Sequence, residues 1–288
     1  MIKIVILGST GLLGSSLLKY FSRKNNYKCY GLIQKKTDII KLNHIKNKKL
    51  YKIDYKKKNN IINLFNKIKP NIIINCIGII KQLVQNYKIS EVIRINSFLP
   101  HYLAQLTNLK KIRFIHFSTD CVFSGTKGNY KETDLPDPQD IYGRSKVLGE
   151  VKYHNTLTLR TSIIGHELKT KNSLLNWFLG QEKFVNGYKN AFFSGLTTLE
   201  VAKVLDKFIF PNKRLTGLYH LSGKKISKYD LLNLIKKVYK KDIKININRK
   251  IKINRSLNSN SLRKIIGYKP RSWNKIINEM YEFNNYKY

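Results

Sequence analysis

The hydrophobic residues of this 288-residue chain follow two patterns that alternate over roughly its first 165 residues. In one pattern apolar residues recur every three or four positions, which predicts amphipathic helices, the longest at residues 91–106. Strands that alternate with helices predict an α/β fold with a doubly wound parallel sheet. Runs that are apolar at nearly every position predict the strands, buried on both faces, at residues 2–7, 29–33, 50–54, 72–78, 112–117 and 156–162.

Three glycines, Gly8, Gly11 and Gly14, join the first predicted strand to the first predicted helix. The first permits a tight turn, the second lets the backbone approach a pyrophosphate at the helix N-terminus, and the third allows helix and strand to pack closely. Strand, glycines and helix in this order predict a Rossmann dinucleotide-binding site. No Gly-Lys-Ser or Gly-Lys-Thr follows, which argues against a P-loop.

The pattern loosens after about Gly165, but further elements are predicted. An apolar run at 217–223 predicts a strand that returns to the main sheet, and periodic segments predict helices at 174–179, 199–210 and 229–239. We therefore expect two domains. The first is a dinucleotide-binding Rossmann domain at residues 1–165, to which 190–222 returns. The second is a smaller C-terminal α/β domain that binds the substrate, at 166–189 and 223–288.

The ends of the predicted strands carry residues suited to a cofactor. Lys35 and Lys36 follow the second strand, where an NAD-binding protein usually has an acid for the ribose 2′-hydroxyl. Two lysines suit a 2′-phosphate, so we expect NADPH, with NADH as the alternative. Asn75 and Gly78 end the fourth strand, where open α/β sheets bind their ligands.

The candidate chemistry lies at Thr119, which follows the fifth strand, and at Tyr142 and Lys146, four positions apart in a predicted helix. Residues with this spacing share one helix face. We expect the ammonium to lower the tyrosine pKa from about 10 and so to provide a general acid or base near neutral pH. Tyr20 and Lys24 have the same spacing, but no hydroxyl at a strand end precedes them, and we interpret them as a chance surface pair.

The charge is extreme, with 55 Lys and Arg against 17 Asp and Glu, a net +38. Nucleic-acid binding is one interpretation. The other is codon usage, because Lys, Asn, Ile and Tyr all have A/T-rich codons and the basic residues are scattered along the chain. We favour codon usage and expect no specific nucleic-acid partner. The charge would still assist the capture of an anionic cofactor or another anionic ligand.

Other compositional features point to a cytoplasmic protein. The longest apolar run, residues 72–80, is far shorter than the roughly 20 residues that span a membrane, so no membrane partner is expected. The chain passes directly from Met1 into a strand pattern, which predicts no signal peptide. Three cysteines without paired spacing and six dispersed histidines predict neither disulfides nor a metal site.

The glycine-rich start, the segment Ser-Thr-Asp-Cys-Val-Phe-Ser-Gly from Ser118 and the segment Tyr-Gly-Arg-Ser-Lys from Tyr142 resemble extended short-chain dehydrogenases/reductases. Within that group the sequence is most similar to the dTDP-4-dehydrorhamnose reductases. The resemblance implies that the cofactor contacts further residues, namely Thr10, Leu12, Leu13, Gln34, Asp54, Cys76 and Ser118. It also implies substrate contacts at Lys81, Asp120, Cys121, Val122 and Arg255.

The resemblance implies reduction of the C4 keto group of a nucleotide-linked 6-deoxy sugar for cell-surface polysaccharides. Tyr142 would protonate the oxygen, Lys146 would hold the nicotinamide ribose and Thr119 would bind the carbonyl. A UDP-2-acetamido-2,6-dideoxy-4-keto-hexose is an alternative substrate, because the rhamnose enzymes usually carry an aromatic residue where Cys121 stands. Epimerisation is another alternative. Dehydration is disfavoured, because dehydratases carry Asp-Glu after the threonine.

One relative of this group is a regulatory subunit of methionine adenosyltransferase, so a regulatory NADP-binding subunit is the non-enzyme alternative. Retention of Thr119, Tyr142 and Lys146 together argues for catalysis instead. A homodimer is one possible assembly.

Overall fold

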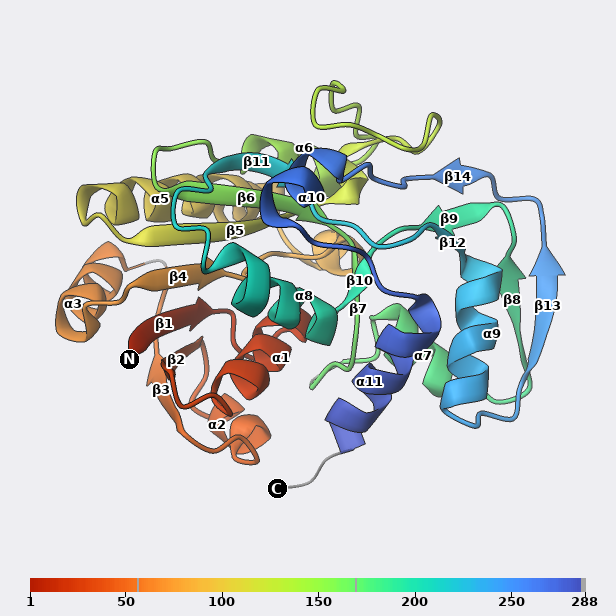
Figure 1. Cartoon of the computed structure of the whole chain (residues 1–288), viewed down its shortest axis with the longest axis horizontal. Helices are drawn as coiled ribbons and strands as arrows, with labels where there is room; N and C mark the ends of the chain where they lie inside the picture. The colour runs from red at the N-terminus through yellow and green to blue at the C-terminus, as the bar shows by residue number, and fades with distance from the viewer. Residues whose placement is uncertain (56, 169, 286–288) are drawn as a thin grey trace.

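The computed structural model describes residues 1–55, 57–168 and 170–285, and a seven-stranded parallel sheet forms its centre (Figure 1). The strand order is β11-β6-β5-β4-β1-β2-β3, so the chain starts in the middle and winds outward in both directions. This is the doubly wound Rossmann arrangement that the sequence predicted. The strands are β1 (Ile2–Leu7), β2 (Tyr27–Ile33), β3 (Lys48–Lys52), β4 (Ile72–Asn75), β5 (Arg113–Thr119), β6 (Thr156–Thr161) and β11 (Gly217–His220).

Helices cover both faces of this sheet, and each face has its own hydrophobic core. Helices α1 (Leu12–Phe21), α8 (Thr198–Val204) and α10 (Asn260–Ile266) pack on one face. Helices α3 (Lys58–Ile68) and α5 (Leu99–Leu109) pack on the other. The short α2 (Asp38–Leu42) follows β2, and α6 (Ile141–Leu148) follows the loop after β5.

Several boundaries differ from those predicted. β3 ends two residues early, at Lys52, and β4 ends at Asn75. β5 continues to Thr119, so this residue closes the strand instead of following it. The long helix expected at 91–106 is divided into α4 (Ile89–Ile93), a π-helical turn η2 (Arg94–Phe98) and α5.

A smaller lobe lies on the right in Figure 1, around α7 (Leu174–Leu179), α9 (Lys228–Val238) and α11 (Trp273–Asn285). Its strands are short and were not predicted, apart from the general expectation of an α/β unit. They are β8 (Phe184–Tyr188) with β13 (Lys244–Asn248), and β12 (Ile226–Ser227) with β9 (Ala191–Phe193) and β14 (Ile253–Asn254). The remaining elements are β7 (Ile163–Ile164) with β10 (Leu196–Thr197), the 3₁₀ turns η1 (Lys81–Asn86) and η3 (Asp120–Val122), and the π-helical turn η4 (Leu205–Ile209).

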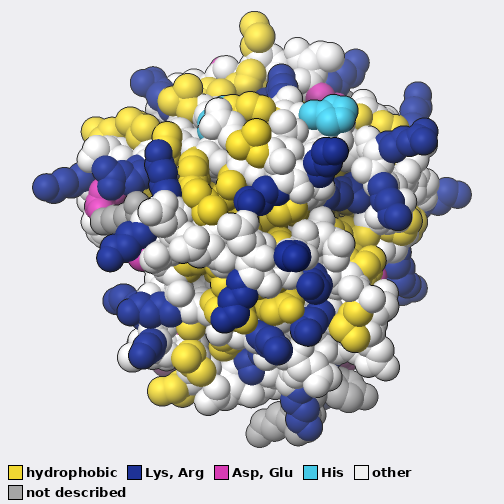
Figure 2. Space-filling view, turned by 90° about the vertical axis from the view of Figure 1, so that its left-hand side faces the viewer, with side chains coloured by type: hydrophobic (Ala, Val, Ile, Leu, Met, Phe, Trp, Pro, Cys, Tyr) yellow, Lys and Arg dark blue, Asp and Glu magenta, His cyan; other side chains and the backbone are white. Residues whose placement is uncertain are grey.

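The basic residues are distributed over the surface. Figure 2 shows Lys and Arg side chains spread over a whole face of the molecule, interleaved with hydrophobic side chains and only a few acids. This distribution accords with the scatter of basic residues along the sequence.

Candidate active site

The glycine turn forms one wall of the site. Gly8 has a φ angle of +75°, in the left-handed region that glycine tolerates, and a side chain there would meet the main chain of Cys76 at 3.1 Å. The N–H of Gly11 donates to the Gly8 carbonyl over 2.9 Å. A side chain at Gly14 would collide with that same carbonyl, so α1 can approach the turn only with glycine there. This geometry fits a pyrophosphate at the start of α1.

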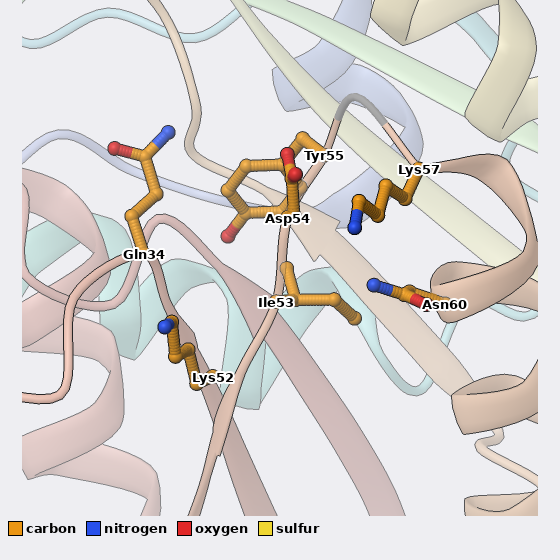
Figure 3. A pocket seen from close by; sticks show the side chains of 7 residues that line it. All are labelled: Gln34, Lys52, Ile53, Asp54, Tyr55, Lys57 and Asn60. Carbon is orange, nitrogen blue, oxygen red and sulfur yellow. The ribbon is translucent and has the colours of Figure 1, made fainter.

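A pocket of about 440 Å³ lies beyond β2 and β3, where a dinucleotide would place its adenosine half (Figure 3). Asp54 lines it, because β3 ends before this residue and releases it into the loop. Figure 3 shows Gln34 on one side of the pocket and Lys57 and Asn60 on the other. Lys52 also lines it, so the pocket holds two lysines that sequence reasoning missed.

The two lysines chosen from the sequence, Lys35 and Lys36, are instead exposed on the turn after Gln34. They do not line this pocket. The prediction that they select the cofactor therefore stays untested.

A cleft of about 660 Å³ opens between the carboxyl ends of the strands and the smaller lobe. Both lobes contribute to its walls, with Ser173 and Phe193 among the residues from the second half of the chain. The cleft brings together most of the residues predicted for the site: Thr10, Gly11, Leu12, Leu13, Gln34, Cys76, Gly78, Lys81, Ser118, Thr119, Asp120, Cys121, Tyr142, Lys146 and Arg255.

Thr119, Tyr142 and Lys146 enter this cleft from two neighbouring elements. Thr119 is the last residue of β5, and its hydroxyl accepts from the N–H of Cys121 over 3.1 Å. The side chain of Asp140 caps α6 by accepting from the N–H of Gly143 over 2.8 Å, and this fixes the first turn, which carries Tyr142. Lys146 lies one turn further on.

Lys146 donates to the main-chain carbonyl of Phe117 in β5 over 2.7 Å. This bond ties α6 to the strand that ends in Thr119. Asn96, on the π-helical turn η2, adds a second tie. Its side chain bonds the main-chain N–H and carbonyl of Ile79 at 2.8 and 3.0 Å and donates to the hydroxyl of Ser145 at 3.0 Å. The strand β5, the helix α6 and the loop after β4 are therefore held as one unit.

The expected effect of Lys146 on the Tyr142 pKa is wrong for this structure. Burial raises the pKa of Tyr142, the Cys121 thiol raises it further, and the Thr119 hydroxyl only partly opposes them. Tyr142 is thus a protonated phenol, suited to donate a proton. Burial lowers the pKa of Lys146 itself to about 8, although Glu150 and Cys76 raise it. Desolvation acts on both groups and outweighs their mutual influence.

A buried ion pair supports the site from behind, and sequence reasoning missed it. Glu150 accepts from Ser118 Oγ over 2.7 Å, while Arg160 binds both of its carboxylate oxygens, each at 2.7 Å. The two side chains are only 6% and 5% exposed. Arg160 also contacts His220 Nε2 at 3.3 Å. The sequence contained one indication of this pair, because Arg160 lies inside an otherwise uncharged strand. A buried arginine in such a strand needs a buried partner of opposite charge.

Two further predicted residues, Val122 and Asn75, do not line the cleft, nor do Gly8, Gly14, Lys35 and Asp54. Val122 is fully buried in a cluster with Phe123, so its proposed substrate contact is wrong. Asn75 is also fully buried. Its amide group bonds His116 Nδ1 at 3.1 Å and the N–H of Ile77 at 3.1 Å, which gives it a structural role at the end of β4.

The pair Tyr20 and Lys24 is not a chance surface pair. Tyr20 is buried, and its hydroxyl donates to Asp206 over 2.8 Å. The ammonium of Lys24 pairs with the same carboxylate at 3.1 Å. This cluster joins α1 to the turn η4 on the helical layer, and the three residues are absent from the lining of the cleft.

The substrate side of the cleft is rich in charge. Arg255 Nε donates to the carbonyl of Phe123 over 2.7 Å, and its NH1 lies 3.9 Å from the sulfur of Cys121. Lys81 pairs with Asp140 at 2.7 Å. Burial raises the pKa of the Asp120 carboxyl, while Lys228 and Arg255 lower it. The charges therefore surround the loop that follows Thr119.

The parallel sheet, the glycine turn and the cleft that joins Thr119, Tyr142 and Lys146 define a protein of the short-chain dehydrogenase/reductase class. The chain belongs to the family described as RmlD substrate binding domain, whose model matches residues 2–285. The resemblance stated from the sequence is thereby confirmed.

Individual relatives are similar to it at modest identity. The dTDP-4-dehydrorhamnose reductase of Aggregatibacter actinomycetemcomitans is 28% identical over 241 residues, which cover 80% of this chain and 76% of the relative. The solved dTDP-4-dehydrorhamnose reductase of Bacillus anthracis, in complex with NADP, has a TM-score of 0.79 at 19% identity and covers 98% of this chain and 99% of its own. Methionine adenosyltransferase 2 subunit beta of Bos taurus is 26% identical over 149 residues, or 51% of this chain and 41% of the relative.

No helix in the ranges 1–55, 57–168 and 170–285 is long and apolar enough to cross a membrane. Within the same ranges, no three His, Cys, Asp or Glu side chains come together as metal ligands would.

Proposed function

We propose that this protein reduces the 4-keto group of a nucleotide-activated 6-deoxy sugar with NADPH. The observation that carries the proposal is the single cleft in which Thr119, Tyr142 and Lys146 face the space beside the glycine turn. Membership of the RmlD family and the reductase name of the Aggregatibacter relative support it.

The residues divide the reaction as follows. NADPH, when bound, supplies the hydride. The protonated Tyr142 gives its proton to the sugar oxygen as negative charge develops there, since burial keeps the phenol neutral. The Thr119 hydroxyl donates a second hydrogen bond to the same oxygen. Lys146, while protonated, holds the cofactor ribose and favours the phenolate that Tyr142 becomes.

The two lobes would divide the binding. Residues 1–165 hold the cofactor, and the segments 166–189 and 223–288 hold the sugar nucleotide. The choice of NADPH is supported by the Bacillus structure with NADP and by Lys52 and Lys57 at the adenosine pocket. The residues at the pocket can bind a 2′-phosphate, because a lysine ammonium is a common phosphate ligand.

The identity of the sugar and of its nucleotide is also part of the proposal. A dTDP-linked 4-keto-6-deoxyhexose is our first choice, with a UDP-2-acetamido sugar as the alternative because a small thiol, Cys121, lines the cleft beside Thr119. Such a reductase would work in the cytoplasm, in the supply of sugars for cell-surface polysaccharides. We propose no specific nucleic-acid partner and leave a homodimer as one assembly to be measured.

The test is NADPH oxidation by the purified protein with a panel of dTDP- and UDP-linked 4-keto sugars, followed by identification of the product. A product reduced at C4 is expected for at least one of them. Exchange of configuration at C4 without net NADPH oxidation would mean epimerisation instead. No turnover of any sugar, together with tight binding to a methionine adenosyltransferase catalytic subunit, would favour the regulatory role.

A further inference from the structure

Lys228 reaches into the main cleft from the smaller lobe, and nothing in the reaction above uses it. It is the first residue of α9 and lines the cleft together with Thr119, Cys121 and Tyr142. Its ammonium lies over the ring of Phe193, 4.4 Å from the ring centre. Among the residues that the structure describes, its ammonium makes no hydrogen bond and no ion pair within 4 Å.

This placement is unfavourable for a lysine in the protein alone. Lys228 is half-buried, and a cation that loses part of its hydration needs a partner that compensates for the loss. The first turn of a helix also carries the positive end of the helix dipole, which disfavours a cation. Burial accordingly lowers the pKa of Lys228. A residue that breaks two local rules and makes no direct ion pair with the described residues is typical of a binding site.

The surrounding charges indicate what would bind. Lys228, Arg255 and Asp120 all line the cleft, and both cations lower the pKa of the Asp120 carboxyl. Two cations therefore face one carboxylate in this part of the cleft. Of the other lysines that line the cleft, Lys81 pairs with Asp140 and Lys146 donates to the carbonyl of Phe117. A bound group that satisfied this part of the cleft would carry a negative charge.

We propose that Lys228 binds an oxyanion of the substrate, and that substrate binding thereby links the smaller lobe to the strand end that carries Thr119. The proposal rests on the function proposed above. The oxyanion has two possible sources, the diphosphate of the nucleotide or a carboxylate on the sugar. Each offers oxygens that can accept hydrogen bonds from the ammonium of Lys228.

The experiment compares Lys228→Gln with the wild type. The binding of UDP, UDP-glucose and UDP-glucuronate, and of dTDP and dTDP-glucose, is measured by calorimetry on the protein saturated with NADP⁺. Lys225→Gln is the matched control, because Lys225 is exposed and lies 4.7 Å from the centre of the neighbouring Phe192 ring. Lys228→Arg retains the charge and should restore most of the affinity. Unchanged NADPH affinity verifies that the variants are folded.

A roughly tenfold or greater loss of affinity for every diphosphate ligand is expected if the phosphates are bound, since hydrogen bonds to charged groups are strong. A loss confined to UDP-glucuronate would identify a carboxylate. Equal affinities in Lys228→Gln and the wild type, or no nucleotide binding by the wild type, would overturn the proposal. The expected affinity loss without reduction of any keto sugar would refute the proposed reaction and leave the role of Lys228 standing.

Discussion

Replacement of Glu150 by Gln tests whether the buried ion pair behind the site supports it. The substitution keeps the shape of the side chain but removes the charge that compensates Arg160, which is 5% exposed. Loss of one partner of a buried ion pair costs about 3–5 kcal/mol, because the remaining charge is left in a poorly solvating environment. For a chain of 288 residues each kcal/mol lowers the melting temperature by roughly 1.7 °C, so we expect a fall of roughly 5–8 °C.

The same variant should also alter the pH dependence of turnover. Glu150 raises the pKa of Lys146, which lies at about 8. Without that carboxylate, Lys146 would lose its proton at a lower pH, and the alkaline limb of the kcat/KM profile should move to lower pH. A purely structural role for Glu150 would lower the melting temperature and leave this limb in place.

The control is Lys189→Met, which removes one partner of the exposed pair of Lys189 with Asp230, whose side chains are 40% and 46% exposed. Surface pairs contribute about 1 kcal/mol or less, so the melting temperature should change by a few degrees at most. Thermal unfolding of both variants, followed by circular dichroism, gives the comparison. If Glu150→Gln melts as close to the wild type as the control does, the reasoning from burial is refuted.

Four further outcomes are expected. Tyr142→Phe should cut turnover by about 10²-fold or more with NADPH binding intact. The control, Tyr20→Phe, removes the hydroxyl that donates to Asp206, so it should melt at a lower temperature but keep its turnover. Wild-type turnover should fall as the pH rises through about 8, where Lys146 loses its proton, and a profile flat to pH 10 would contradict this role. Joint replacement of Lys35 and Lys36 by Ala should raise the KM for NADPH more than that for NADH, and equal changes would show them to be surface charge. Binding to a fluorescent DNA duplex should be weak, about 10⁻⁴ to 10⁻⁶ M, and collapse with salt; submicromolar binding displaced by NADPH would make nucleic acid a candidate partner.

The parts of the molecule that could be predicted are those governed by local pattern. The strand β1 and the glycines after it follow from a short apolar run and a turn that requires glycine, and the structure has both as expected. The strands of the smaller lobe were harder to predict. Strands such as β8 (Phe-Val-Asn-Gly-Tyr) are short and mixed in polarity, and their pairing joins residues far apart in the chain. Contact with a distant element also decides the roles of Lys228 and Arg160.

The chemistry of the site was predictable in its members but not in its electrostatics. Spacing alone places Tyr142 and Lys146 on one face of α6, and the structure agrees. Spacing does not report how much water each group loses, and that loss raises one pKa and lowers the other. Spacing also does not show that the apolar side chain of Val122 packs inward with Phe123, while Cys121 before it lines the cleft.

The position of β11 at the edge of the sheet has a consequence for the biosynthesis of the chain. β11 pairs with β6 along Leu157–Arg160, but it is translated about 55 residues later. When residues 1–165 have emerged from the ribosome, all the strands of the sheet except β11 are present. The main-chain groups of β6 on the edge where β11 will pair then have no partner. Open strand edges pair readily with other chains. Expressed alone, the segment 1–165 should therefore self-associate, and only emergence of Gly217–His220 completes the sheet and supplies His220 to Arg160.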